Sequence, residues 1–232
     1  MVFAQKTRDI CRLYRSTPLL HSFGVHVVSL DEMTGIQALE RLHPTLPMKP
    51  GLIERREFEY LRHGTLSLIA GFDVATGQIV ASSMGPTRNE TDFAMQVRQL
   101  VETDPEGEWI FVADGLNTHH SESLVRLVAG YCHLVEPLGQ KGSFGILMTE
   151  ASRTAFLADS SHRIRFVYTP KHCSWLNQIE IWFSILVRRL LKRSSFKNTL
   201  DLQKQIFLFV AYFNETMAKP FKWTYAGKPL CA

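Results

Sequence analysis

Residues 169–184 read TPKHCSWLNQIEIWFS, and the fold expected for the chain is organised around this stretch. Pro170 follows an apolar run, so it ends a strand and keeps Thr169 extended. Ser174 is then placed to cap a helix. The apolar residues of that helix recur at steps of three and four: Leu176, Ile179, Phe183, Leu186 and Leu190. Glu180 lies early in this helix beside the apolar row. An unpaired carboxylate is costly there, so we expect it to meet a partner or a metal ion.

Two acidic residues upstream follow apolar runs that are typical of buried strands. Residues 26–30 lead into Asp31, and residues 109–113 lead into Asp114. In open α/β sheets, functional residues lie beyond the carboxyl ends of the strands. We therefore expect Asp31, Asp114 and Glu180 to converge at one edge of a sheet.

The remaining sequence alternates between strand and helix patterns. Strands are expected at 65–73, 78–83 and 165–168, and helices at 89–103, 121–129, 148–157 and 200–213. A tight turn at 75–77 joins the first two of these strands. Residues 43–64, which carry several prolines and charges, are expected to form an excursion outside the core. This order predicts an α/β fold with a mixed sheet and helices packed on it.

Length and composition limit the organisation of the chain. Its 232 residues, 45% of them hydrophobic, are enough for one sizeable core. We expect a linker or remnant helix at 1–20, a main domain at 21–215 and a basic tail at 216–232. No apolar run approaches the roughly 18 residues of a membrane span, and the charged N-terminus does not resemble a secretory signal. The four cysteines lack zinc-ligand spacing, so we expect reduced thiols in a cytoplasmic protein.

A cluster of cations follows the start of the Glu180 helix. The net charge of +4 is mild, but five basic residues crowd together: Arg188, Arg189, Lys192, Arg193 and Lys197. Such a run is as typical of a solvated face as of a contact with nucleic acid. Both interpretations stay open at this point.

Three converging carboxylates would form a site of hard oxygen ligands, which suits Mg²⁺ or Mn²⁺ better than Zn²⁺. Two such ions, roughly 3.5–4 Å apart, would stabilise the attacking and leaving oxygens of a phosphodiester displacement, with Asp114 bridging them. Asn117, His119 and His120 follow Asp114 closely and are candidates for supporting the ligands. Acidic residues at strand ends also serve as caps and loop charges, an alternative that spacing alone leaves equally open.

Three segments resemble DDE transposases of the mariner-related bacterial insertion-sequence family numbered six-thirty. They are VVSLDEMTGIQALER around Asp31, WIFVADGLNTHHSESL around Asp114 and YTPKHCSWLNQIEIWFSILVRRLLKR around Glu180. The closing AYFNETMAKPFKWTYAGKPL is also similar to the end of that family. The resemblance implies an RNase H-like fold with a mixed five-stranded sheet. It also implies metal-dependent DNA strand cleavage and transfer.

The resemblance further implies roles for individual residues and partners. Asp31, Asp114 and Glu180 would be the catalytic and metal-binding triad with two Mg²⁺ or Mn²⁺ ions, supported by Asn117, His119 and Asn177. The five clustered cations would bind DNA, both element ends and target. Relatives prefer TA targets and act as homodimers on DNA. The resemblance also implies a bacterial protein of the cytoplasm that is associated with the nucleoid when it is bound to DNA.

Two departures from the family pattern matter. Relatives carry an N-terminal helix-turn-helix region that binds the element ends, and this chain has room for one helix before Asp31. We therefore expect a missing recognition domain or a separate recognition subunit. The interval between Asp114 and Glu180 is also longer than in relatives, which predicts an insertion at 130–163 before the catalytic helix. Its cations Lys141, Arg153 and Arg163 are a hypothetical DNA contact.

Two other classes of protein are retained as alternatives. One is an inactive or repurposed transposase fragment that binds DNA. The other is a stand-alone RNase H-like nuclease, which would need a fourth acid, and Glu32 or Asp73 would have to serve. Trp182 could stack on a base, but its helical spacing favours the core. His172 and Cys173 have no partners at metal-ligand spacing.

Overall fold

The computed structural model describes residues 2–227 and is built on a five-stranded sheet in the order β3-β2-β1-β4-β5. The strands are β1 (Val25–Arg41), β2 (Tyr60–Asp73), β3 (Ile79–Gly85), β4 (Glu108–Ala113) and β5 (Ile164–Tyr168). β1, β2 and β3 pair antiparallel, whereas β4 is parallel to both β1 and β5. The predicted mixed five-stranded sheet is confirmed.

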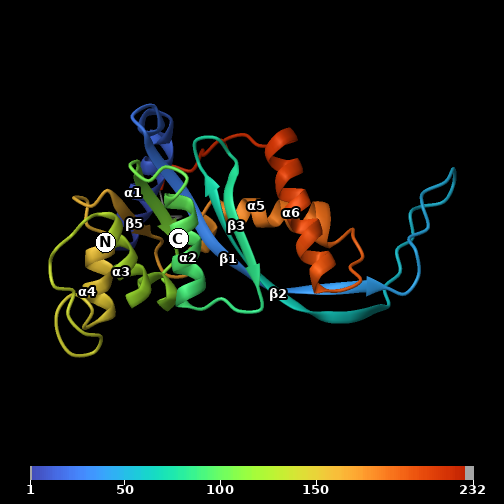
Figure 1. Ribbon diagram of the computed structural model, residues 1–232. Coiled ribbons are helices and arrows are strands. Elements are labelled where there is room, and N and C mark those ends of the chain that lie inside the picture. The colour runs from blue at the N-terminus through green and yellow to red at the C-terminus, as the bar shows by residue number, and fades with distance from the viewer. Residues whose placement is uncertain (1, 228–232) are drawn as a thin grey trace.

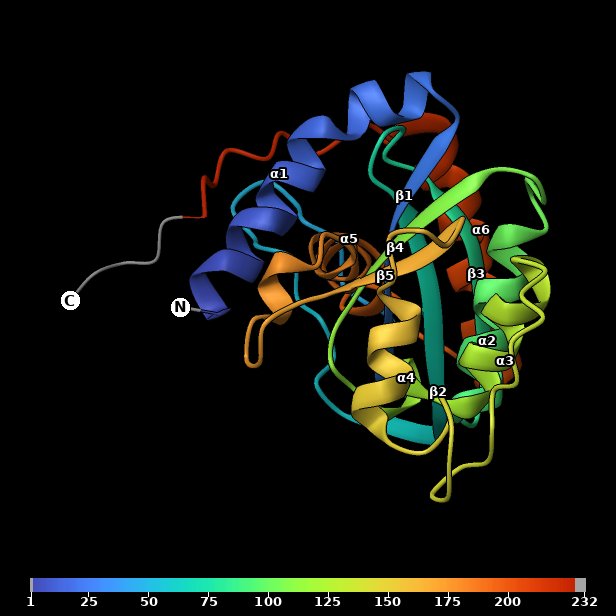
Figure 2. The same cartoon turned by 90° about the vertical axis from the view of Figure 1, so that its left-hand side faces the viewer.

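Helices cover both faces of this sheet (Figure 2). Helices α1 (Val2–Ser22), α5 (Ile179–Leu186) and α6 (Thr199–Thr216) contribute to one core cluster, on the face that includes Val27 and Val112. Helices α2 (Glu90–Val101), α3 (Glu122–Tyr131) and α4 (Glu150–Leu157) contribute to the second, on the face that includes Leu30 and Phe111. None of the helices in the described part of the chain combines the length and apolar composition that a membrane crossing requires.

The β1–β2 hairpin is much longer than the sequence pattern predicts. Both strands run on beyond the body of the protein, and residues 42–59 form a loop at the far end (Figure 1). Bulges interrupt the pairing between Met33 and Ile36 and between Gln37 and Leu39. Gly35, with φ of 68°, takes the left-handed conformation inside the first bulge, which few other residues adopt without cost. The expected excursion is therefore the end of a projecting hairpin.

The helix expected at residues 1–20 extends to Ser22 and packs into the core. Ile10, Cys11 and Tyr14 are buried against the sheet. The Tyr14 hydroxyl donates to the backbone oxygen of Leu176 at 2.8 Å and lies 3.2 Å from Oγ of Ser29. Helix α1 thereby supports the segment that leads into α5. The last five residues of the predicted tail at 216–232 lie outside the described residues.

The start of the Glu180 helix differs from the prediction that Ser174 caps it. Ser174 instead begins a short 3-10 turn, Ser174–Leu176, and α5 starts at Ile179 after Gln178, without a side-chain cap. Asn177 has a φ of −81° and a ψ of 115°, so extended backbone separates the two helical pieces. At the other end, α5 passes into a π-helical turn, η3 (Val187–Leu191), which shifts the regular apolar stripe beyond Leu186.

Candidate active site

Sheet register places Asp31 and Asp114 side by side. Ser29 pairs with Val112 in the parallel β1–β4 ladder, and continuing that register by two residues brings Asp31 level with Asp114. Side chains alternate along a strand, so Asp31 shares the face of Val27 and Ser29, and Asp114 shares that of Val112. This face is the one that α5 covers.

Asp31 does not end its strand, which corrects the sequence-based expectation. β1 continues to Arg41 and pairs Asp31 with Ala70 of β2. β4, the parallel neighbour of β1, ends at Ala113, just before Asp114. Within the described part of the chain, β1 pairs beyond this level with β2 alone. The apolar run at residues 26–30 corresponds only to the part of β1 that is paired on both sides, with β2 and β4.

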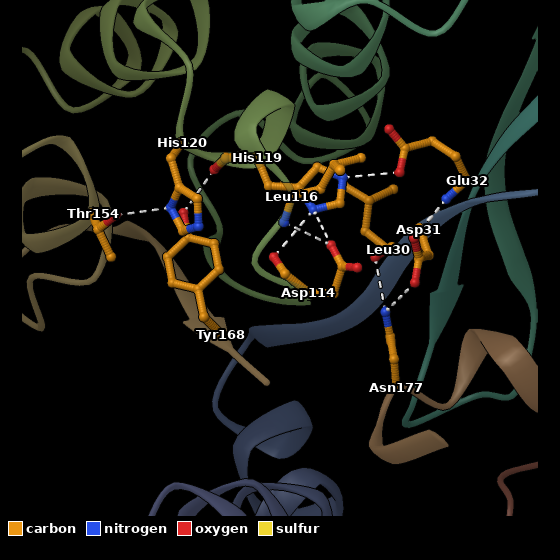
Figure 3. Close-up of polar contacts among 10 residues, drawn as sticks. All are labelled: Leu30, Asp31, Glu32, Asp114, Leu116, His119, His120, Thr154, Tyr168 and Asn177. Carbon is orange, nitrogen blue, oxygen red and sulfur yellow. Dashed lines mark hydrogen bonds and ion pairs between the residues drawn. The ribbon is translucent and has the colours of Figure 1, made fainter. Parts of the chain in front are cut away.

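Asp31 is held by contacts on both oxygens. Its side chain is almost fully buried, Oδ1 accepts from the backbone N–H of Glu32 at 2.8 Å, and Oδ2 accepts from Nδ2 of Asn177 at 3.2 Å (Figure 3). The same amide donates to the backbone oxygen of Leu30 at 3.0 Å. Asn177 stands three residues before Glu180, so this contact couples the third acid's helix to the first acid.

Asp114 is held by a buried histidine. Nδ1 of His119 lies 2.8 Å from Oδ1 of Asp114, which also accepts from the backbone N–H of Leu116 at 3.0 Å (Figure 3). Nε2 of His119 lies 2.9 Å from Oε2 of Glu32, whose side chain is 2% exposed. The imidazole therefore bridges two carboxylates, while its ring stacks on Phe93 at 4.0 Å between centroids.

Sequence reasoning treated Glu32 only as a spare acid and missed its bond to His119. Glu32 follows Asp31 on the same strand and thus points to the opposite face, toward α2 and η1 (Asn117–His120). The alternation was readable from the sequence, but the position of His119 was not. The other spare acid, Asp73, caps the β2–β3 turn by accepting from the backbone N–H of Ala75 at 2.7 Å.

The pKa values follow from burial and mutual repulsion. Burial, and then the charge of Asp114, raises the pKa of Asp31 to about 7. The same two causes raise the pKa of Glu180. Burial also acts to raise the pKa of Asp114, but its hydrogen bond to His119 and the charge of that ring outweigh burial and lower it. Burial would lower the pKa of His119, yet its two carboxylate partners raise it to about 10.

This arrangement fits a divalent cation. Asp31 and Glu180 both feel the charge of Asp114, and a cation among the three would relieve that repulsion. Ligand atoms of Asp31, Glu32 and His119 also lie within 4.8 Å of one another. Both nitrogens of His119 are already engaged by carboxylates, and an imidazolium repels a cation. The three carboxylates are therefore the better ligand set for Mg²⁺ or Mn²⁺.

The sequence model of the DDE superfamily endonuclease family matches residues 26–203, which include all three acids. The chain belongs to the DDE superfamily endonucleases. A comparison with curated proteins gave no significant match.

Solved structures with the same fold include those of the Mos1 mariner transposase. Its paired-end complex with Mn superposes with a TM-score of 0.55 at 14% identity, over 91% of this chain and 56% of that one. The paired-end complex with the left transposon end gives 0.56 at 14% identity, over 96% and 57%. The isolated Mos1 catalytic domain gives 0.52 at 12% identity, over 91% and 82%. The endonuclease chain thus has the RNase H-like fold and spans little more than half of the Mos1 chain in those complexes.

The cations predicted to bind DNA lie on the surface of this DDE endonuclease. Arg188, Arg189, Lys192, Arg193 and Lys197 are all exposed, in and after η3. Arg188 and Lys192 line a hollow of about 470 Å³, and Glu180, Glu32 and Phe183 are among its other lining residues. Asn117 is exposed.

The cations of the predicted insertion have partners within the protein. Arg153 donates to the backbone oxygens of His120 and Leu147, at 2.6 and 3.0 Å. Arg163 donates to the backbone oxygens of Gly107 and Tyr131, at 2.8 and 2.7 Å. Lys141 lies 3.7 Å from Glu90. The backbone contacts give Arg153 and Arg163 a structural role, whereas the ion pair of Lys141 is exposed, with side chains 52% and 39% accessible. Trp182 is fully buried, as its spacing predicted.

Proposed function

We propose that this chain is the catalytic domain of a DDE transposase of the mariner-related bacterial insertion-sequence family, cutting DNA at element ends and joining them to target DNA. The observation that carries the proposal is the placement of Asp31 and Asp114 level with each other on neighbouring strands, beneath the helix that presents Glu180. The family match and the fold shared with Mos1 support it.

Asp31, Asp114 and Glu180 would hold the metal ions. Two Mg²⁺ or Mn²⁺ ions bound there would supply charge neutralisation at the attacking and leaving oxygens of a phosphodiester. The Mos1 structures include forms with Mg and with Mn, which supports this choice of ions. The chain's own contribution is to fix the ligands: Asn177 orients Asp31, and His119 orients Asp114.

The reaction has two displacements at phosphorus. Water first adds to the phosphorus at the element end, and the bond from phosphorus to the 3′ oxygen breaks. The freed 3′-hydroxyl then attacks a phosphodiester of the target and releases a target 3′ oxygen. Arg188 and Lys192, in the hollow next to Glu180, would hold phosphates of the bound strand.

We also propose that the assembly resembles the paired-end and strand-transfer complexes solved for Mos1. Two copies would bridge two DNA ends. Recognition of the element ends would come from a helix-turn-helix region on a separate subunit or on further chain.

The test is nicking and strand transfer on a pre-cleaved end oligonucleotide with Mg²⁺ or Mn²⁺. Asp114→Asn should lower the rate by about a thousandfold or more, since several kcal/mol of charge stabilisation are removed. Asp73→Asn, which alters a turn-capping carboxylate away from the site, is the matched control. Metal-dependent nicking without joining would replace the proposal with a stand-alone nuclease. Binding without metal-dependent reaction would replace it with a repurposed fragment.

A further inference from the structure

The loop between β5 and α5 walls a second hollow beside the candidate acids. This hollow, of about 340 Å³, has Asp114 and Gly115 on one side and Lys171, His172 and Ser174 on the other. It shares no lining residue with the hollow that contains Glu180 and Arg188. The carboxylates are therefore flanked by two different hollows, one beside Glu180 and one beside Asp114.

The loop is fixed in place relative to the acids. The backbone N–H of Thr169 donates to the oxygen of Ala113 at 2.9 Å, next to Asp114 in the chain. Cys173 and Leu176 are buried in the core, and Asn177 bonds to Asp31. A loop anchored at both ends to the catalytic strands presents its exposed groups at a defined distance from the reacting centre.

Three side chains of this loop point outward from that anchored backbone. Lys171 and His172 are exposed, and Trp175 is 50% exposed with its ring in edge contact with Tyr225 at 5.2 Å. Across residues 2–227, Lys171 makes no ion pair with a carboxylate. His172 has a φ of 61°, a left-handed conformation that side chains other than glycine rarely take and that is concentrated at functional positions.

We propose that Lys171, His172 and Trp175 form a binding surface for an unpaired DNA strand on the Asp114 side of the site. The inference rests on the proposed function, because a strand whose phosphate lies at the carboxylates must continue on both sides of them. Arg188 and Lys192 serve the Glu180 side. On the other side, Lys171 and His172 contact phosphates, and Trp175 stacks on a base.

The test measures binding in EDTA, where no reaction occurs, to a DNA end with a single-stranded extension. Lys171→Gln with His172→Asn removes the ammonium group and the imidazole, and asparagine tolerates the left-handed backbone. The slope of log affinity against log salt should fall in magnitude by about 0.7 for each single-strand phosphate that the variant no longer neutralises. Lys219→Gln, an exposed lysine beside Gly77 at the opposite edge of the sheet, is the control and should leave the slope unchanged.

Tryptophan fluorescence tests the stacking contact separately. Trp109 and Trp182 are buried, and Trp223 is half-buried with its ring in edge contact with Tyr14. The part of the quenching by the added strand that disappears in Trp175→Phe therefore reports Trp175. An unchanged salt slope in the Lys171/His172 variant would overturn the phosphate contacts. Equal loss of affinity on a blunt duplex would overturn the assignment to an unpaired strand.

Because these measurements need no metal, they separate the two proposals. A reduced slope and absent quenching in variants of a protein that never joins DNA would support the strand surface and contradict the transposase function. Joining that requires Asp114, together with an unchanged slope, would support the function and overturn the surface. Unchanged thermal unfolding of each variant would show that the weaker binding is not caused by misfolding.

Discussion

His119 and Glu32 lie 87 residues apart in the chain and form a buried pair, with Nε2 of the ring 2.9 Å from Oε2 of the carboxylate. Their side chains are 0% and 2% exposed. The other ring nitrogen lies 2.8 Å from Asp114. The pair therefore links Glu32 of β1 to the turn that follows β4, on the face of the sheet opposite α5. The same histidine also fixes the carboxylate of Asp114.

His119→Ala should strongly destabilise the fold, because it leaves the Glu32 carboxylate buried without a counter-charge. We expect a loss of about 3–5 kcal/mol in the free energy of unfolding, measured by urea denaturation. His63→Ala is the matched control. His63 of β2 pairs with Glu40 of β1 at 2.7 Å, but these side chains are 30% and 34% exposed, so the loss should be about 0–1 kcal/mol. Equal losses of unfolding free energy in both variants would show that burial of the His119–Glu32 pair does not increase its contribution to stability.

The raised pKa of Asp31 predicts that the metal-free protein loses stability as the pH rises. The folded state holds this proton up to a pKa of about 7, whereas the unfolded chain releases it near 3.8. The contribution is therefore fully present below pH 3.8 and is lost as the pH rises through 7. Thermal unfolding in EDTA between pH 4 and 7 measures it.

Two comparisons isolate this effect. Asp31→Asn cannot ionise, so its unfolding temperature should fall less over the same pH range. Mg²⁺ or Mn²⁺ should offset the fall in the unmodified protein near pH 7, because the cation binds the ionised carboxylate. If Asp31→Asn shows the same pH dependence as the unmodified protein, another group carries it.

Local sequence pattern predicted the sheet and both strand acids, because buried strands leave a clear apolar signal. It placed Asp31 at a strand end, since the apolar run stops there. In the structure β1 continues to Arg41 and, among the described residues, pairs there only with β2. Ile36 and Ala38 of this part are buried, but bulges between Met33 and Ile36 and between Gln37 and Leu39 interrupt the alternation by which a strand is recognised in the sequence.

The residue at which α5 starts could not be predicted from the local sequence pattern either. Ser174 has the residue type of a helix cap, but the chain uses Asn177 in an extended conformation to reach Asp31, a contact between segments 146 residues apart. The bond between Glu32 and His119 is of the same kind. Such tertiary contacts override local capping preferences and are visible only once the strands are in register.

Tyr14→Phe should measure how far α1 supports the segment that leads into α5. The variant removes the buried hydroxyl that donates to the backbone oxygen of Leu176 at 2.8 Å and leaves that oxygen without this donor. We expect a loss of about 1–3 kcal/mol in the free energy of unfolding. Tyr212→Phe, on the exposed face of α6, should change it by less than about 0.5 kcal/mol. If Tyr14→Phe leaves the free energy of unfolding unchanged, apolar packing alone holds α1 in place.

Neutralising Arg188 and Lys192 should weaken DNA binding in a salt-dependent way. Both side chains are exposed and line the hollow next to Glu180. If each contacts a phosphate of duplex DNA, the double variant Arg188→Gln/Lys192→Gln should reduce the slope of log affinity against log salt by about 0.9 per phosphate. Fluorescence anisotropy at several salt concentrations gives this slope.

Arg126→Gln is the control for this experiment. Arg126 is exposed on α3 and lies 2.7 Å from Glu122, so it already has a partner and belongs to the helices on the opposite face of the sheet. Its replacement should leave the salt slope unchanged. A slope that falls equally in both variants would mean that the weaker binding reflects net charge alone. A slope that falls only in the Arg188/Lys192 variant would place the duplex along the turn after α5, because counterion release reports phosphates contacted locally.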